Sequence, residues 1–146
     1  MAEKKKMTER IIIVSGYFDP IHKGHIEYFN LAKALGDKLI VILNNDAQCV
    51  LKKRKSFMEQ EERKVILEAI KYVDEVFMSI DDDKSVCKSI EAIANKYKNK
   101  EVIFAKGGDR FSYEIPEAEV CKKLKIKIVD RLGEKIQSSS GLTGLK

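Results

Sequence analysis

The chain has 146 residues, of which 44% are hydrophobic and 35% are charged. This length and balance predict one folded domain with a single core and argue against disorder. The 28 basic residues exceed the 23 acidic ones, which gives a formal net charge of +5. That excess suits anionic small molecules and is too small to indicate a nucleic-acid partner. No apolar run reaches the length of a membrane span.

We expect a flexible basic tail over residues 1–9 and one domain over residues 10–146. The lysines near the N-terminus precede no apolar stretch, so no signal peptide is predicted. The three cysteines are odd in number and widely spaced. They favour reduced thiols and a cytoplasmic location.

The first predicted strand covers residues 10–15, where branched apolar residues follow one another as in a strand buried on both faces. Residues 26–35 carry apolar side chains at helical spacing. The turn between such a strand and its helix binds phosphates in open α/β sheets, because the helix N-terminus presents free N–H groups and a positive dipole end. Gly16 and Gly24 lie in this turn and would let the backbone bend and a ligand approach.

The two histidines of the chain, His22 and His25, both lie in this turn. Their spacing could place two metal ligands on one helical face. A zinc site would need further ligands, and there is no third histidine and no cysteine nearby. We therefore expect no metal site built from protein side chains.

Strands and helices alternate along the rest of the chain. Gly36 is predicted to end the first helix, and Ser56 with Glu59 forms a capping box that would begin another helix. The predicted strands cover residues 38–43, 74–79, 101–105 and 125–129, and the predicted helices cover residues 56–70, 86–97 and 116–124. This alternation predicts an α/β fold, a Rossmann-like open sheet of about five parallel strands in the order 3-2-1-4-5 with helices on both faces.

Three charged segments each allow two interpretations. Residues 52–55 are four consecutive cations; most such runs are solvated loops, but this one follows the carboxyl end of a strand, so we favour a phosphate-binding loop. Arg63 has acidic neighbours, and a site arginine and a helix-surface pair remain equally open. Residues 81–83 are all aspartate and indicate a solvated helix start rather than a metal cluster.

Two further segments have a composition typical of ligand contacts. Lys106, Gly107, Gly108 and Asp109 follow the fourth predicted strand. In the expected strand order this loop faces the histidines across the crevice at the centre of the sheet. Near the C-terminus, three serines at 138–140 fit either a helix N-cap or a phosphate-binding helix start.

Between Gly16 and His25 the chain resembles the cytidylyltransferase-like nucleotidyltransferases, whose signature is a small residue, Phe-Asp, and then His-x-Gly-His. The superfamily includes cytidylyltransferases for glycerol 3-phosphate, choline phosphate and ethanolamine phosphate, and adenylyltransferases for heptose phosphate, pantetheine phosphate and nicotinamide nucleotide. The resemblance implies transfer of a nucleotide monophosphate from a nucleoside triphosphate to a small phosphorylated acceptor, with release of pyrophosphate.

The resemblance also implies roles for individual residues. The catalytic residues are His22, His25, Lys52 and Arg131, and Arg63 and Asp46 bind the acceptor. The nucleotide-binding residues are Gly16, Tyr17, Phe18, Asp19, Gly24, Lys106, Gly107, Gly108, Asp109, Ser138 and Ser139. The C-terminal serine segment has one residue more than the family's Arg-Thr-Glu-Gly-Ile-Ser-Thr motif, so it departs from that pattern.

For the substrate, the resemblance favours CTP with an acceptor such as glycerol 3-phosphate, because residues 63–76 are most similar to the glycerol-3-phosphate cytidylyltransferases. The alternative is ATP with a sugar phosphate, because residues 106–109 are nearer to the heptose-phosphate adenylyltransferases. An alternative of another class is a non-catalytic nucleotide-binding or nucleic-acid-binding module. The resemblance further implies Mg²⁺ bound mostly by the triphosphate, a homodimer, and no membrane or nucleic-acid partner.

Overall fold

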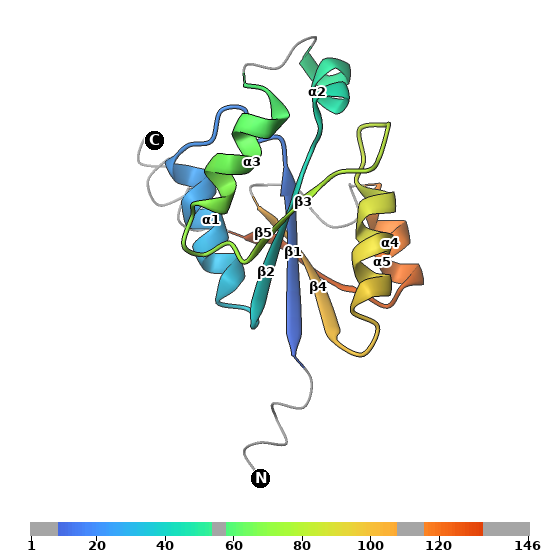
Figure 1. Ribbon diagram of the computed structural model, residues 1–146. Coiled ribbons are helices and arrows are strands. Elements are labelled where there is room, and N and C mark those ends of the chain that lie inside the picture. The colour runs from blue at the N-terminus through green and yellow to red at the C-terminus, as the bar shows by residue number, and fades with distance from the viewer. Residues whose placement is uncertain (1–8, 54–57, 108–115, 133–146) are drawn as a thin grey trace, which may run out of the picture.

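The structure is a computed structural model that describes residues 9–53, 58–107 and 116–132 (Figure 1). Five parallel strands form one sheet in the order β3-β2-β1-β4-β5, which confirms the predicted α/β, Rossmann-like architecture. Central strand β1 pairs with both β2 and β4, and Ile13 lies opposite Ile40 and Phe104. The strands are β1 (Arg10–Gly16), β2 (Lys38–Leu43), β3 (Glu75–Met78), β4 (Glu101–Gly107) and β5 (Lys127–Leu132).

Helices cover both faces of the sheet. The helices are α1 (Lys23–Lys33), α2 (Asp46–Lys53), α3 (Gln60–Glu68), α4 (Cys87–Lys96) and α5 (Glu117–Lys123). Helices α1 and α3 lie on one face, α4 and α5 lie on the other, and α2 stands beyond the end of β2 (Figure 1). Among the described residues, no helix is long and apolar enough to cross a lipid bilayer.

Alternate side chains of β1 supply the two cores. Ile11 and Ile13 pack with the α4 residues Ile90 and Ile93, whereas Ile12 and Val14 pack with residues of α1 and α3. All four β1 side chains are 0% exposed, as expected for a parallel strand between two helical layers. The helix predicted over residues 86–97 is confirmed as α4, and its N-cap Val86 packs in the first of these cores with Ile90 and Ile93.

Several predicted boundaries are wrong for local reasons. Helix α1 ends at Lys33 with Ala34 as its C-cap. Gly36 instead leaves space for the Ile12 side chain, because a Cβ at position 36 would lie 2.7 Å from Ile12 Cδ1. Helix α3 begins at Gln60, and its N-cap Glu59 makes no side-chain capping bond. Glu59 therefore precedes α3 as its N-cap and is not the third residue of the helix, as the predicted capping box required. Ser56 lies outside the described residues.

Two ends of elements also differ from the prediction. Strand β5 begins at Lys127, after Lys125 has taken a positive φ of 61° that a strand residue does not adopt. Asp81, expected in a solvated helix start, is 4% exposed, and its carboxylate accepts the N–H groups of Lys88 and Ser89. It caps α4 from inside the fold.

The predicted tail and the domain meet at Glu9. Residues 1–8 lie outside the described residues. The carbonyl of Glu9 accepts the N–H of Glu101 at 3.1 Å, and its carboxylate pairs with Lys100 at 3.3 Å. Glu9 therefore contacts the domain, and the described fold begins one residue before the predicted boundary.

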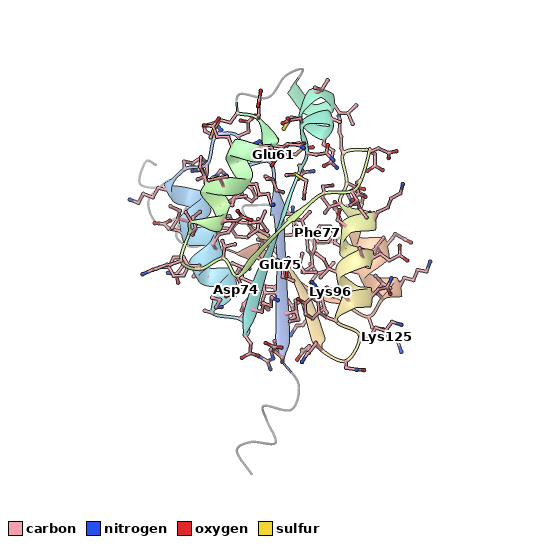
Figure 2. All side chains as sticks on the ribbon, viewed as in Figure 1. Glu61, Asp74, Glu75, Phe77, Lys96 and Lys125 are labelled. Carbon is pink, nitrogen blue, oxygen red and sulfur yellow. The ribbon has the colours of Figure 1, made fainter. Side chains whose placement is uncertain are left out.

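Ion pairs occupy the amino-terminal edge of the sheet. Glu75 pairs with Lys38 at 3.3 Å and with Lys96 at 3.7 Å, and Asp74 pairs with Lys33 (Figure 2). These side chains are partly exposed, so each pair contributes little to stability. Phe77, two residues after Glu75 in β3, packs against the core on the α4 side of the sheet (Figure 2). The candidate site residues belong to the opposite, carboxyl-terminal edge.

Candidate phosphate-binding site

The turn between β1 and α1 is built around Phe18. Its φ is 50°, and its ring packs edge-on against Phe29 and, at 4.9 Å between centroids, against His25. A Cβ on Gly16 would lie 2.7 Å from Phe18 Cζ. The Phe18 ring thus leaves no space for a side chain at position 16, and approach of a ligand to Gly16 stays a prediction.

The two histidines form a capping box at the start of α1. His22 is the N-cap; its Nδ1 accepts the N–H of Gly24 at 3.1 Å, and His25 Nδ1 accepts the N–H of His22 at 3.0 Å. The rings stack with centroids 3.9 Å apart. A Cβ on Gly24 would lie 3.1 Å from His22 Cε1, so this glycine leaves space for the capping ring.

This arrangement determines which ring nitrogens can donate. Backbone N–H groups can only donate, so both Nδ1 atoms are acceptors and each neutral imidazole carries its proton on Nε2. The sequence predicted free N–H groups in this turn, but the N–H groups of His22 and Gly24 donate to the imidazoles. The site therefore offers Nε2–H donors in place of these two backbone groups.

We expect His25 to be neutral at physiological pH. Burial and the neighbouring imidazole of His22 lower the pKa of His25 to about 4. Unfolded histidine has a pKa near 6.5, so the unfolded chain binds more protons between about pH 4 and about pH 6.5. The free energy of unfolding should rise with pH across this window. Above about pH 6.5 the gain should be complete, and the free energy should show no further change from His25.

Urea unfolding across the window, together with an NMR titration of the imidazoles, measures this effect. His25→Gln should remove the contribution of this side chain to the slope and serves as the matched control. A titration midpoint of His25 near 6.5 would contradict the expectation.

Arg63 of α3 ties together the chain segments around this turn. It is 1% exposed. Its Nη1 donates to the carbonyls of Tyr17 at 2.8 Å and Asn44 at 2.7 Å, and its Nε donates to the carbonyl of Met58 at 3.0 Å. Its Nη2 forms a 2.7 Å ion pair with Asp46 Oδ1. One guanidinium thus joins the ends of β1 and β2 to the starts of α2 and α3.

The burial of Arg63 decides between the interpretations that the sequence left open. A helix-surface pair with its acidic neighbours is wrong, because Arg63 is buried and pairs with Asp46 of α2, whereas Glu61 and Glu62 are exposed. The geometry gives Arg63 a scaffold role beneath the site. Direct contact of Arg63 or Asp46 with an acceptor stays a prediction.

The predicted cationic loop is in part a helix. Lys52 and Lys53 are the last two residues of α2, so the chain is helical where a loop was expected. The reason is the start of α2, which no sequence pattern singled out. Asn45 and Gln48 cap the start of this helix, and their Asn-x-x-Gln spacing is a variant of the capping box. Cations at a helix C-terminus interact favourably with its dipole. Residues 54–57 lie outside the described residues.

The end of β4 adjoins the end of β1, as predicted, because the two strands are hydrogen-bonded neighbours. Tyr28 of α1 donates its hydroxyl to the carbonyl of Ala105 at 2.6 Å, and burial raises the pKa of Tyr28. This tyrosine links the histidine helix to β4, and no sequence pattern singled it out. Lys106 Nζ lies 5.9 Å from the centroid of the Phe104 ring.

The remaining predicted site residues are described in part or not at all. Gly107 is the last residue of β4, and Arg131 lies in β5, both at the carboxyl edge. Gly108, Asp109, Ser138 and Ser139 lie outside the described residues. The structure therefore brings Arg63 and Asp46 together with the turn that carries Asp19 and the histidines. The end of β4 lies next to this group, because β4 pairs with β1.

The carboxylates of the site are engaged within the protein. Asp19 Oδ1 accepts the N–H of Met58 at 2.7 Å, and Asp46 pairs with Arg63. Among the residues that the structure describes, no group of three histidine, cysteine, aspartate or glutamate side chains could hold a metal ion.

Comparison with protein families and curated proteins gives a consistent result. A family model described as cytidylyltransferase-like matches residues 13–140. The chain is 42% identical over 79 residues to FAD synthase of Thermococcus kodakarensis, which is 53% of this chain and 52% of that protein. It is 34% identical over 120 residues to bifunctional protein HldE of Helicobacter pylori, 81% of this chain and 24% of that protein.

A third relative is glycerol-3-phosphate cytidylyltransferase of Bacillus subtilis, 46% identical over 65 residues, which is 44% of this chain and 50% of that protein. The chain thus spans about half or less of the length of these curated relatives. A lipopolysaccharide core biosynthesis protein from Thermoplasma volcanium has the same fold, with a TM-score of 0.66 and 23% identity over 84% of this chain and 96% of that chain.

Proposed function

Because the chain belongs to the cytidylyltransferase-like family, we propose that it transfers a nucleotide monophosphate from a nucleoside triphosphate to a small phosphorylated acceptor and releases pyrophosphate. The observation that carries this proposal is the histidine capping box. It presents two imidazole Nε2–H donors at the carboxyl edge of the central strand, where open α/β sheets bind phosphates.

In the proposed reaction an oxygen of the acceptor phosphate attacks the α-phosphorus in line, and the bond from the α-phosphorus to the bridging oxygen of the leaving pyrophosphate breaks. Such a transfer depends on positioning and charge stabilisation, with no side-chain nucleophile. His22 and His25 donate to triphosphate oxygens, and Lys52 and Arg131 add positive charge. Mg²⁺ would arrive with the triphosphate, whose oxygens are its preferred ligands, and would offset the phosphate charge.

For the nucleotide we propose CTP, with an acceptor such as glycerol 3-phosphate. The similarity to glycerol-3-phosphate cytidylyltransferase, 46% over 65 residues, supports this choice. The second candidate is ATP with a sugar phosphate, which the resemblance of residues 106–109 supports. Calorimetric titration with CTP and with ATP, each with Mg²⁺, tests the nucleotide.

Pyrophosphate release over a panel of phosphorylated alcohols and sugars then tests the reaction. Tighter ATP binding with ATP-dependent release on a sugar phosphate would replace our proposal by the second candidate. Triphosphate binding without release on any acceptor would favour a non-catalytic nucleotide-binding module. Salt-sensitive binding of a polynucleotide would favour the nucleic-acid alternative.

We also propose a homodimer in a reducing, cytoplasmic environment. The family resemblance supports the dimer, and the three cysteines, all free thiols in the structure, fit a reducing compartment. Sedimentation at micromolar protein concentration is expected to give twice the chain mass of 16.7 kDa. A species with the mass of one chain at that concentration would refute the dimer.

A further inference from the structure

Two carboxamide side chains cap the start of α2 reciprocally. Asn45 Oδ1 accepts the N–H of Gln48 at 2.9 Å, and Gln48 Oε1 accepts the N–H of Asn45 at 3.0 Å. Helix α2 has only eight residues, and a helix of this length is unstable by itself in water. Its place in the fold therefore depends on contacts at its ends and sides.

The NH₂ groups of the same two carboxamides bind the segment between β3 and α4. Each NH₂ group donates to two backbone carbonyls of residues 79–85, and Gln48 is 0% exposed. The four acceptors, at 2.7 to 3.1 Å, are the carbonyls of Ser79, Asp81, Asp83 and Ser85. We call this set of four bonds the carboxamide tie. It fixes α2 to a segment that Asp81 in turn fixes to α4.

The opposite side of the first turn of α2 is held by α3. The N–H of Asp46 donates to Gln60 Oε1 at 2.9 Å, and the carboxylate of Asp46 pairs with Arg63. Side chains of the protein thus use the N–H groups of Asn45, Asp46 and Gln48. The last two residues of this helix are Lys52 and Lys53.

We propose that Asn45 and Gln48 are positioning residues for nucleotidyl transfer. The carboxamide tie fixes the position of the C-terminal end of α2, which carries Lys52, relative to the histidine turn. This inference rests on the proposed function, in which Lys52 binds phosphate. Gln48 and Lys52 are four positions apart in α2, about one turn of the helix backbone. A displacement of about 1 Å at a reacting group can cost large factors in rate, so a short helix that carries such a group needs a rigid anchor.

Asn45→Asp and Gln48→Glu separate the tie from the helix cap. Each replaces an NH₂ group by oxygen, so the donors to residues 79–85 are lost, while the oxygen that accepts the capping N–H is kept. We expect kcat/KM and triphosphate affinity to fall by about tenfold or more. This is the factor for loss of one charge-assisted hydrogen bond, here the proposed bond from Lys52 to a phosphate oxygen. Two variants are needed because the buried Gln48→Glu protein could fail to fold.

Ser89→Ala is the matched control. It removes bonds of the same buried region, from the N–H of Ile80 and to Asp81, without touching α2. We expect a comparable loss of thermal stability with kcat/KM within about twofold of wild type, since the four bonds of the carboxamide tie remain in this variant. If Ser89→Ala lowered kcat/KM as much as the carboxamide variants, the effect would be one of stability and the proposal would be overturned.

A double-mutant cycle with Lys52→Ala gives the decisive readout. In the Lys52→Ala background the carboxamide variants should cost less than about twofold, because the side chain that they position is gone. An unchanged cost in that background, or wild-type kinetics in both carboxamide variants, would overturn the proposal.

Triphosphate titration by calorimetry keeps this test independent of the reaction. A wild-type protein that binds triphosphate without releasing pyrophosphate would refute the proposed function, and the same cycle measured on binding would still decide the role of the carboxamides. A wild-type protein that binds neither CTP nor ATP would overturn both.

Discussion

Replacing either histidine of the turn, by His22→Ala or His25→Ala, is expected to lower kcat by about 10²-fold or more, as removal of one preorganised donor does in other enzymes. Triphosphate binding should weaken far less, because the two Nε2–H groups serve charge that develops during the transfer. Steady-state pyrophosphate release and calorimetric titration of the nucleotide measure the two quantities separately.

The capping role of His22 calls for a variant that separates stability from catalysis. His22→Ala also removes the N-cap of α1, which costs about 1 kcal/mol. His22→Asn keeps a side-chain acceptor suited to an N-cap and lacks the imidazole donor, so it should restore stability and remain slow. Asn30→Ala, at an exposed position of the same helix, should change neither. Near wild-type kcat in both alanine variants would contradict the assignment of the site.

Arg63→Met is expected to lower the free energy of unfolding by about 3 kcal/mol, because three backbone carbonyls lose a charged donor at about 1 kcal/mol each. The guanidinium is buried and donates to three carbonyls and to Asp46. Without it, carbonyls at the ends of β1 and β2 and before α3 lose their donor, and buried acceptors without partners are costly. Urea unfolding gives the free energy directly.

Two further variants sharpen this test. Lys64→Met, one residue along α3, removes a 3.7 Å pair with Glu68 between side chains that are 38% and 50% exposed; it should change stability by less than about 0.5 kcal/mol. Arg63→Lys keeps the charge without the planar fork, so it should recover only part of the loss. A loss below about 1 kcal/mol for Arg63→Met would mean that the clamp on the site segments is dispensable.

The order of strands followed from patterns that are local in the chain. Residues 11–14 and 39–43 are continuous apolar runs, and a strand with that composition needs helices on both faces. Together with alternating helical segments, they allow few topologies. The histidine motif was equally visible, because its residues are adjacent in the chain and its place after a buried strand predicts a phosphate-binding turn.

Local patterns failed where a side chain bonds to residues far along the chain. Arg63 has acidic neighbours in sequence, yet its bonds reach Tyr17, Asn44 and Asp46. The role of Arg63 has no sequence spacing, because it depends on how α3 packs against the ends of β1 and β2.

By itself, the sequence determined the α/β class, the strand order and the turn that carries the histidines, since hydrophobic period and motif spacing express forces that act over a few residues. Only the tertiary structure decided which nitrogen of each imidazole can donate, which way Arg63 points, and what holds α2 in place. Those outcomes are set by hydrogen-bond partners that must be satisfied once the groups are buried. The partners come from segments that meet only when the sheet has formed.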